Sequence, residues 1–517
     1  MYVGVWTLSG VSDRMYGTTG GVLGNPMTCT HIGWMPQVIT VATVVLAVSA
    51  ACAKVRFNES TVQGPGDSIL SCDLDGDGLK DIVVADEPNL AIYYQDAQRG
   101  FAESPDQVCP LGDNPSVFWP ARLAEGAQSL LVMTSDGVTE LDFTTRRGPA
   151  TRKRIITQKT VLPDSSKGAS VAYFPLSPRI EGGAPVILLP VGGDLQVWRL
   201  EETWQRVQTL VGALETSIWA SRDGLGYDQR AELTLSFGDI TADHRDDILL
   251  RTSLVPICRY TMYAQREDGL FTTAPILTWS GKWDWSWYCW TDINRDGRVD
   301  LMNSKWLQEP WFIPGMLSGR VLVRIFMAGE QGQIPAEPQQ IFRKNDWIDS
   351  IPVVDIDGDG CMDLALGYST FDSREGFRKA LTAKQIDFKL RFHFCRPGGS
   401  FAEKPDCDAS LLIRLDHPST ELSYSRSWYL DRFVSLLGDF DGDGDKDLLV
   451  RDRADRISAY PFISRQVGFA RSAGAEFGYT DPFDRMRIED LNNDRVSDLI
   501  LSSRNKDLVR IFISRTR

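Results

Sequence analysis

The sequence has few histidines, namely His31, His244, His393 and His417 among 517 residues. None of them belongs to a spaced metal-binding pattern, and no nucleophile elbow, phosphate-binding loop or dinucleotide fingerprint is recognisable. These absences argue against histidine-based catalysis and nucleotide chemistry, so an enzyme is not the leading hypothesis. A paired-carboxylate enzyme stays open, because carboxylates are abundant and their meetings in space are invisible in a sequence.

An excess of basic residues is also lacking. The formal net charge is -14, whereas nucleic-acid recognition needs a basic face that releases counterions from the phosphates. We therefore expect no nucleic-acid partner. Much of the acid lies in repeated loops, and one divalent cation in each of six loops would nearly neutralise the protein. Metal binding accounts for this acidity better than an acidic partner surface does.

No hydrophobic run has the usual length of a membrane span. The run Val38 to Ala51 is nearly uncharged and has the length of a signal-peptide core. Residues 1–53 are therefore predicted to be a mis-annotated leader followed by an export signal, with the true start at Met35. Cys52 follows small residues, as in a lipoprotein cleavage site, although Ala51 to Ala53 also suits ordinary cleavage. An uncleaved anchor is the alternative.

One acidic loop recurs along the rest of the chain. In its fullest copy, Asp439, Asp441, Asp443 and Asp447 stand at positions 1, 3, 5 and 9, and Gly444 stands at position 6. Four carboxylates are hard oxygen donors of the kind that Ca²⁺ prefers, and the glycine permits a turn that aims the position 7 carbonyl inward. A short β-branched run follows the loop, which indicates a buried strand.

Six copies keep oxygen donors at positions 1, 3, 5 and 9, with a backbone carbonyl at position 7. The copies starting at 239 and 490 have His244 and Arg495 in place of the turn glycine, and the first of these is expected to bind more weakly. The predicted metal ligands are Asp73, Asp75, Asp77, Leu79, Asp81; Asp239, Thr241, Asp243, Arg245, Asp247; Asp292, Asn294, Asp296, Arg298, Asp300; Asp355, Asp357, Asp359, Cys361, Asp363; Asp439, Asp441, Asp443, Asp445, Asp447; and Asp490, Asn492, Asp494, Val496, Asp498.

Two further copies, at residues 121–129 and 177–185, keep Glu-Gly at positions 5 and 6 but lack the other carboxylates, so they are predicted to be units without metal. First positions at 73, 121, 177, 239, 292, 355, 439 and 490 give a spacing of roughly 50–60 residues for most units, which is typical of four-stranded propeller blades. We predict an all-β propeller over residues 54–517 with eight blades, or seven if one degenerate unit is an irregular excursion. The last unit lacks an outer strand, which Val55 to Glu59 can supply.

The longest interval contains an insertion at residues 371–384, which reads as a loop with one helical turn. Insertions in repeat folds usually lie on a working face.

The motif Asp-x-Asp-Gly-Asp-Gly-x-x-Asp-Leu, followed two strands later by Gly-Phe-Ala-Glu (100–103) or Gly-Ser-Phe-Ala-Glu (399–403), resembles the FG-GAP/VCBS repeats of integrin-α-like β-propellers. The likeness covers about residues 55 to 517. It implies that the loops bind Ca²⁺ as structural clips, about five to six ions in all, and that partners bind elsewhere. Known relatives range from adhesion receptors to lectins and carbohydrate-active enzymes, so function below the family level does not transfer.

Two further clusters carry alternatives. Alternation places Trp283, Trp285 and Trp287 on one side of a strand, where they can stack on a sugar or a protein, and packing between blades is the alternative. Seven cysteines follow Cys52, and their spacing suggests three local disulfides, with small buried hydrophobic residues as the alternative. The suggested pairs are Cys72/Cys109, Cys258/Cys289 and Cys395/Cys407, leaving Cys361 alone.

Taken together, these patterns predict an exported, calcium-binding β-propeller. It would act as a cell-surface or periplasmic binding or adhesion module for protein or glycan, touching a membrane only through an N-terminal lipid or anchor. A carbohydrate-active propeller enzyme, a lyase or hydrolase, is the alternative.

Overall fold

The computed structural model describes residues 55–515 except 65–68, 87, 113–114, 116, 124–125, 144–147, 162–171, 174–176, 179–183, 213–216, 222–223, 229–232, 242, 255–256, 283–286, 307–320, 331, 345–352, 370–373, 416–432, 454, 480–482, 484 and 504–505. Residues Lys54–Arg517 form one compact unit. The leader predicted for residues 1–53, with Met35 and Cys52, lies outside the described residues and stays a prediction.

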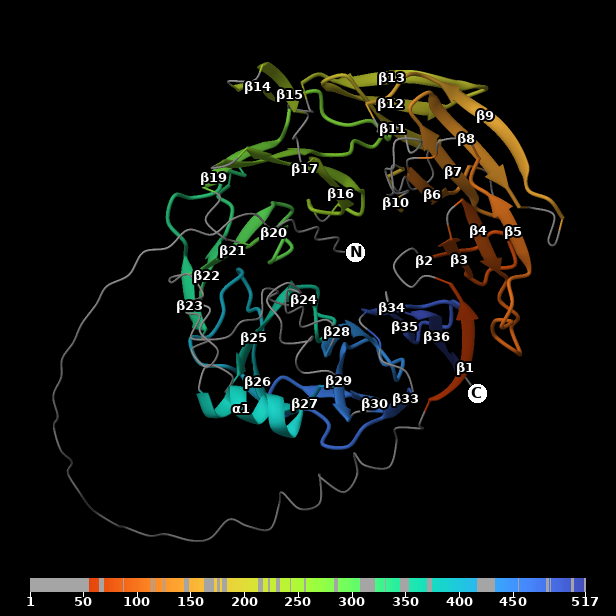
Figure 1. Ribbon diagram of the computed structural model, residues 1–517. Helices are drawn as coiled ribbons and strands as arrows, with labels where there is room; N and C mark the ends of the chain where they lie inside the picture. The colour runs from red at the N-terminus through yellow and green to blue at the C-terminus, as the bar shows by residue number, and fades with distance from the viewer. Residues whose placement is uncertain are drawn as a thin grey trace, which may run out of the picture. The chain divides into compact units, whose positions relative to one another are not determined.

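The described chain is almost entirely β-structure, and eight sheets follow one another in chain order as the blades of a β-propeller (Figure 1). The predicted fold class and the preferred count of eight blades are confirmed. Blades 1 to 4 contain β2 (Ile69–Cys72), β3 (Asp81–Asp86), β4 (Asn89–Tyr93), β5 (Gln107–Pro110); β6 (Val117–Ala121), β7 (Ser129–Thr134), β8 (Gly137–Asp142), β9 (Thr151–Thr157); β11 (Val186–Val191), β12 (Asp194–Leu200), β13 (Trp204–Leu210); and β16 (Leu233–Gly238), β17 (Asp247–Leu254), β18 (Ile257–Tyr263), β19 (Leu277–Lys282).

The second half of the ring repeats the same antiparallel pattern. Blades 5 to 8 contain β20 (Trp287–Thr291), β21 (Asp300–Trp306), β22 (Val321–Phe326), β23 (Gln340–Lys344); β24 (Val353–Val354), β25 (Asp363–Ser369), β26 (Gln385–His393), β27 (Cys407–Arg414); β28 (Val434–Gly438), β29 (Asp447–Arg453), β30 (Arg456–Tyr460), β33 (Ala475–Gly478); and β34 (Arg485–Glu489), β35 (Asp498–Ser503), β36 (Lys506–Arg515), β1 (Arg56–Gln63). Two small hairpins lie outside the blade sheets, β14 (Ser217–Ser221) with β15 (Gly224–Asp228) and β31 (Phe462–Ser464) with β32 (Gly468–Phe469).

The two ends of the described chain close the ring. Strand β1 pairs antiparallel with β36 over its whole length, from Arg56 opposite Arg515 to Gln63 opposite Leu508. The prediction that the N-terminal strand completes the last blade is confirmed. The last sheet is built from both ends of the described chain, and β1 serves as its outer strand.

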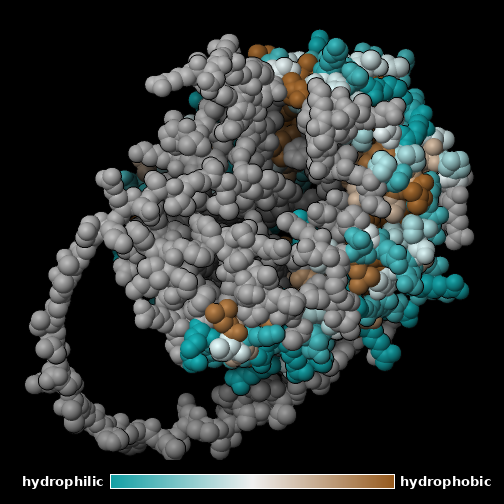
Figure 2. Space-filling model, viewed as in Figure 1, coloured by the Kyte–Doolittle hydropathy of each residue, from teal (hydrophilic) through white to brown (hydrophobic). Residues whose placement is uncertain are grey.

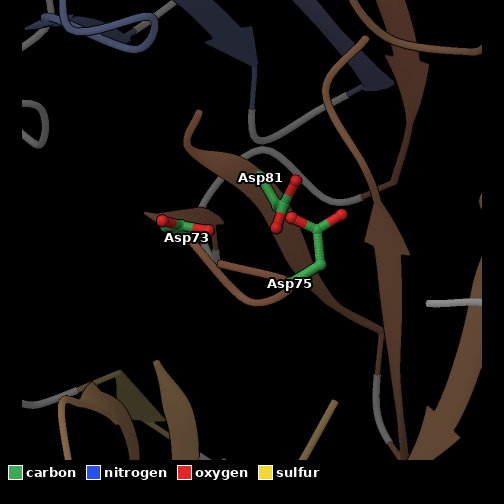
Figure 3. Close-up of side chains that lie close together, drawn as sticks. All are labelled: Asp73, Asp75 and Asp81. Carbon is green, nitrogen blue, oxygen red and sulfur yellow. The ribbon is translucent and has the colours of Figure 1, made fainter. Parts of the chain in front are cut away.

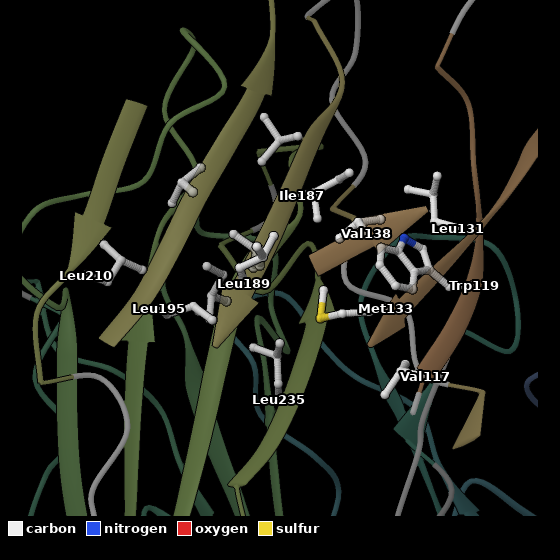
Figure 4. Packing of buried hydrophobic residues seen from close by; sticks show 14 of the residues in the cluster. Val117, Trp119, Leu131, Met133, Val138, Ile187, Leu189, Leu195, Leu210 and Leu235 are labelled. Atoms are coloured by element: carbon white, nitrogen blue, oxygen red, sulfur yellow. The ribbon is translucent and has the colours of Figure 1, made fainter. Parts of the chain in front are cut away.

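The core lies between neighbouring blades. Separate clusters of buried apolar residues join blades 1 and 2, blades 4 and 5, and each later pair round to blades 8 and 1, while one larger cluster spans blades 2, 3 and 4. In the larger cluster, Trp119 and Met133 of blade 2 face Ile187 and Leu189 of blade 3 (Figure 4). In most blades the second strand contains a short apolar run that is buried on both faces, as in β3 (Ile82 to Ala85) and β29 (Leu448 to Val450).

The third blade departs from the predicted pattern. The short strand β10 (Ala172–Tyr173), which precedes it, pairs in parallel with β6 of blade 2 and not with β11. Three strands of blade 3 are described. Position 9 of this unit is Pro185, whereas the six acidic loops have an aspartate there. The third unit therefore lacks a carboxylate at this position.

The insertion in blade 6 contains a helix, α1 (Arg374–Ala383), which is longer than the single turn expected. Its Ala380 is fully buried in the core between blades 6 and 7, whereas Leu381 is exposed. No described helix combines the length and apolar character needed to cross a membrane. In Figure 2 hydrophilic residues cover most of the coloured surface, with small apolar groups between them.

Candidate metal centres

Three groups of carboxylates converge closely enough to hold a metal ion. Each group offers three oxygens that lie within 4.8 Å of one another, and all nine residues belong to the predicted acidic loops. The groups are Asp73, Asp75, Asp81; Asp355, Asp357, Asp359; and Asp439, Asp441, Asp447. Figure 3 shows the first group in the loop between β2 and β3. In the other three acidic loops position 3 is Thr241, Asn294 or Asn492, whose side chains offer hydroxyl or amide oxygens instead.

All six loops occupy equivalent places in the fold, because each connects the first strand of a blade to the second. The loop from Asp439 to Asp447, for example, runs from β28 to β29. The loops therefore lie at the same end of their sheets. This arrangement follows from the antiparallel order of the strands.

The aspartate at position 9 does more than the sequence predicted, because both of its oxygens accept backbone hydrogen bonds. In blade 7, Asp447 accepts from the N–H of Phe440 at 2.6 Å and from the N–H of Phe462 at 3.2 Å. The same pair of bonds, 2.6–3.1 Å long, is made by Asp81, Asp247, Asp300, Asp363 and Asp498. Each carboxylate thus fastens its own loop to the end of the third strand.

The aspartate at position 1 shapes the loop itself. Asp439 accepts from the N–H groups of Gly442 at 2.6 Å and Gly444 at 2.8 Å. Both glycines have positive φ, 82° and 99°, where a side chain is disfavoured. His244 and Arg495 adopt the same left-handed conformation at φ 66° and 70°, which costs of the order of 1 kcal/mol each.

The loops of neighbouring blades are joined by backbone hydrogen bonds that the sequence did not reveal. The N–H at position 8 of one loop donates to the carbonyl at position 1 or 2 of the preceding loop, at 2.6–2.8 Å. The donors and acceptors are Lys80 to Leu491, Gln128 to Asp73, Met362 to Ile293, Lys446 to Ile356, and Ser497 to Asp439. Gln128 belongs to the degenerate unit at residues 121–129. This unit therefore makes the same backbone hydrogen bond to the preceding loop, although it lacks the predicted metal ligands.

Burial raises the pKa of several loop aspartates far above the ordinary value for a carboxyl group. It raises the pKa of Asp81, Asp363, Asp447 and Asp498 to about 7, because desolvation of the charged form outweighs the backbone hydrogen bonds. Burial and the negative charge of Asp443 raise the pKa of Asp441 to about 6. A cation among these groups would offset both effects.

The donor set fits a hard divalent cation. Asp355 places one carboxylate oxygen, Oδ1, in a buried position where it accepts no hydrogen bond. A buried carboxylate oxygen without a donor costs free energy unless a cation or proton satisfies it. The loops of blades 1, 6 and 7 could therefore hold such an ion, with carboxylates as its ligands.

The predicted tryptophan surface is described only in part. Trp283 and Trp285 lie outside the described residues, and Trp287 begins β20 without a described side chain. Trp279 and Trp290 of the same stretch pack with Tyr260 and Tyr288, with ring centroids 5.0–6.0 Å apart, in the cluster between blades 4 and 5. Trp279 and Trp290 therefore pack between blades, and the ligand surface at Trp283, Trp285 and Trp287 stays a prediction.

The suggested disulfides are wrong. All seven cysteines are thiols: Cys72, Cys109, Cys258, Cys289, Cys361, Cys395 and Cys407. Cys72 lies on β2 and Cys109 on β5, the two edge strands of a four-stranded sheet. At the usual strand spacing these strands are about 14 Å apart, which is too far for a disulfide. Cys258 and Cys289 belong to different sheets. Most of these side chains fill the core, as the alternative predicted.

Comparison with known proteins adds only a remote likeness. No protein-family model and no curated protein matches the chain. Among solved structures, the chain is similar to a lectin of Agrocybe aegerita that is described as specifically recognising non-reducing terminal N-acetylglucosamine. The TM-score is 0.37 and the identity 14%, over 68% of this chain and 87% of that one.

We predict that positions 9 and 3 of a loop respond differently to truncation in the absence of cations. Asp447→Ala leaves the buried N–H groups of Phe440 and Phe462 without their acceptor, which should cost about 2–4 kcal/mol of unfolding free energy. Asp441→Ala removes one weaker bond, to the N–H of Asp443 at 3.3 Å, and should cost less than about 0.5 kcal/mol. Denaturant unfolding in a chelator measures both. Equal losses would contradict the anchoring role of position 9.

We also predict an inverted pH dependence for the cation-free protein. The folded pKa values near 7 exceed the ordinary value of about 3.9, so the folded chain binds more protons than the unfolded chain. Stability from these groups is present below about pH 4 and is lost as the pH rises towards 7. The melting temperature in a chelator should therefore fall between pH 5 and pH 7.5, and less so in Asp447→Asn. A rise over this interval would contradict the prediction.

Proposed function

We propose that the protein is an exported, calcium-binding β-propeller of the FG-GAP/VCBS type. It acts as a binding or adhesion module for a protein or glycan at a cell surface or in the periplasm. The observation that carries the proposal is the recurrence of one carboxylate loop between the first two strands of six blades. A feature that recurs in most blades supports the fold, so the partner is expected to bind where the repeat is broken.

Calcium is the proposed cation because the donors are carboxylate, amide, hydroxyl and carbonyl oxygens. About five to six ions, one per acidic loop, match the number of acidic copies. Exported proteins meet Ca²⁺ at millimolar concentration, where modest affinity is sufficient. Binding only to the folded state then stabilises it by mass action. Export itself rests on the hydrophobic run Val38 to Ala51, with Cys52 as the proposed lipid attachment site.

Two features that break the repeat are the proposed ligand surface. The first is the sequence segment with Trp283, Trp285 and Trp287, since aromatic side chains are favoured at protein and sugar interfaces. The second is the insertion with α1, which packs through Ala380 and leaves Leu381 exposed. Both lie outside the acidic loops, so the cations would hold the scaffold without touching the ligand.

Calcium should raise the melting temperature of the intact protein. At a hundredfold excess over the dissociation constant, each occupied loop adds about 2.7 kcal/mol to the unfolding free energy. Asp441→Ala should reduce the stabilisation by about one loop's share. Asp387→Ala, which removes an acid paired with Lys379 outside the loops, should keep the whole effect. Differential scanning calorimetry with Ca²⁺ or a chelator tests this, and an unchanged midpoint in protein free of metal would refute the calcium proposal.

Binding without turnover should be seen when the calcium-loaded protein is tested on glycan arrays and on extracellular matrix proteins. Trp285→Ala should weaken the interaction at least about tenfold, as expected for an aromatic hot-spot residue, without lowering the melting temperature. Val211→Ala, at a position 79% exposed on blade 3, is the matched surface control. Release of sugar fragments would contradict a binding module and support the enzyme alternative.

A further inference from the structure

An arginine of blade 7 reaches the acidic loop of blade 6. Arg465 directly follows β31, in the hairpin with β32. Its Nε donates to Asp357 and its Nη2 donates to Asp359, at positions 3 and 5 of the loop. One guanidinium group thus bridges two carboxylates that belong to the converging group of this loop.

The guanidinium has further partners that hold it in place. Its Nη1 donates to the carbonyl of Cys395 at 3.3 Å, and its central carbon lies 5.5 Å from the centre of the Phe394 ring. Both residues follow β26 of blade 6. The two carboxylates raise the pKa of Arg465 above its usual range, so the group stays charged. The contacts therefore form a site for a cationic side chain at two of the three carboxylates that could hold a metal ion.

This contact differs from the arginine contacts within other loops. Arg245 pairs with Asp243, and Arg298 pairs with Asp296, so each arginine at position 7 meets position 5 of its own loop. Arg465 instead comes from the next blade and spans positions 3 and 5. A divalent ion that draws both carboxylates inward would face the positive guanidinium at short range, where like charges repel strongly.

We propose that Arg465 competes with the divalent cation for the loop of blade 6. The loop is held either by Arg465 or by the cation, so it binds Ca²⁺ more weakly than it would without the arginine. Cation binding there releases the Arg465 side chain from Asp357 and Asp359, while the apolar packing of the hairpin against Phe392 and Phe394 stays in place. The inference rests on the proposed function, because it assumes that the acidic loops bind a divalent cation.

Arg465 leaves one oxygen of this loop unsatisfied. Asp355 Oδ1 has no hydrogen-bond partner while Arg465 occupies Asp357 and Asp359. The guanidinium carries one positive charge and satisfies only the two outer carboxylates, whereas a divalent ion at the centre could contact all three. The arginine therefore reduces the repulsion among the acids without completing the site.

Calcium titration of the full-length protein tests the competition. Arg465→Gln removes the charge and keeps a polar side chain, and it should tighten Ca²⁺ binding at one site about tenfold, measured by isothermal titration calorimetry. Arg465→Lys retains the charge and should leave affinity within a few-fold of wild type. Arg456→Gln removes an ion pair with Glu476 in the same blade, away from the loop, and should change nothing.

A second variant assigns the gain to this loop. In Arg465→Gln combined with Asp359→Asn, the tighter site should be lost, while the remaining sites titrate as in wild type. If wild type binds Ca²⁺ and Arg465→Gln binds it equally or more weakly, the competition is refuted and the proposed function stands. If no form of the protein binds Ca²⁺, the proposed function fails and the competition fails with it.

Discussion

The propeller depends on a buried aspartate that accepts two backbone hydrogen bonds in each of six blades. An unpaired carboxylate would be too costly to bury, and the N–H groups would also be destabilising without an acceptor. The residue therefore joins the loop, the second strand and the end of the third strand into one unit. In the third unit Pro185 takes its place, and the short strand before it pairs with the neighbouring blade instead.

A second level of organisation joins the blades to one another. Apolar clusters fill the spaces between neighbouring sheets, and backbone hydrogen bonds run from loop to loop. Pairing of β1 with β36 completes the last blade. Arg465 adds a charged link of the same kind between blades 6 and 7. Neighbouring loops are thus joined by direct contacts.

Features with a local cause were predicted well. The spacing of Asp439 to Asp447 and the apolar run after it define a loop and a strand without reference to the rest of the chain, and they recur at blade intervals. Ring closure followed from counting strands. The disulfides failed because cysteines close in sequence, such as Cys72 and Cys109, are separated by the width of a sheet. The helix in the insertion is longer than the single turn expected, and its Ala380 is buried in the core between blades 6 and 7.

By itself, the sequence determined the repeat, the fold class and the identity of the acidic residues, because loop and strand patterns are short-range. It favoured eight blades over seven, and the structure decided between the two counts. Only the tertiary structure decided what those acids contact. The double role of Asp447, the bonds from Lys446 to Ile356 and from Ser497 to Asp439, and the bridge from Arg465 to Asp357 and Asp359 all join segments that meet only when the blades pack. Such contacts depend on strand order and blade packing, which leave no periodic signal in the sequence.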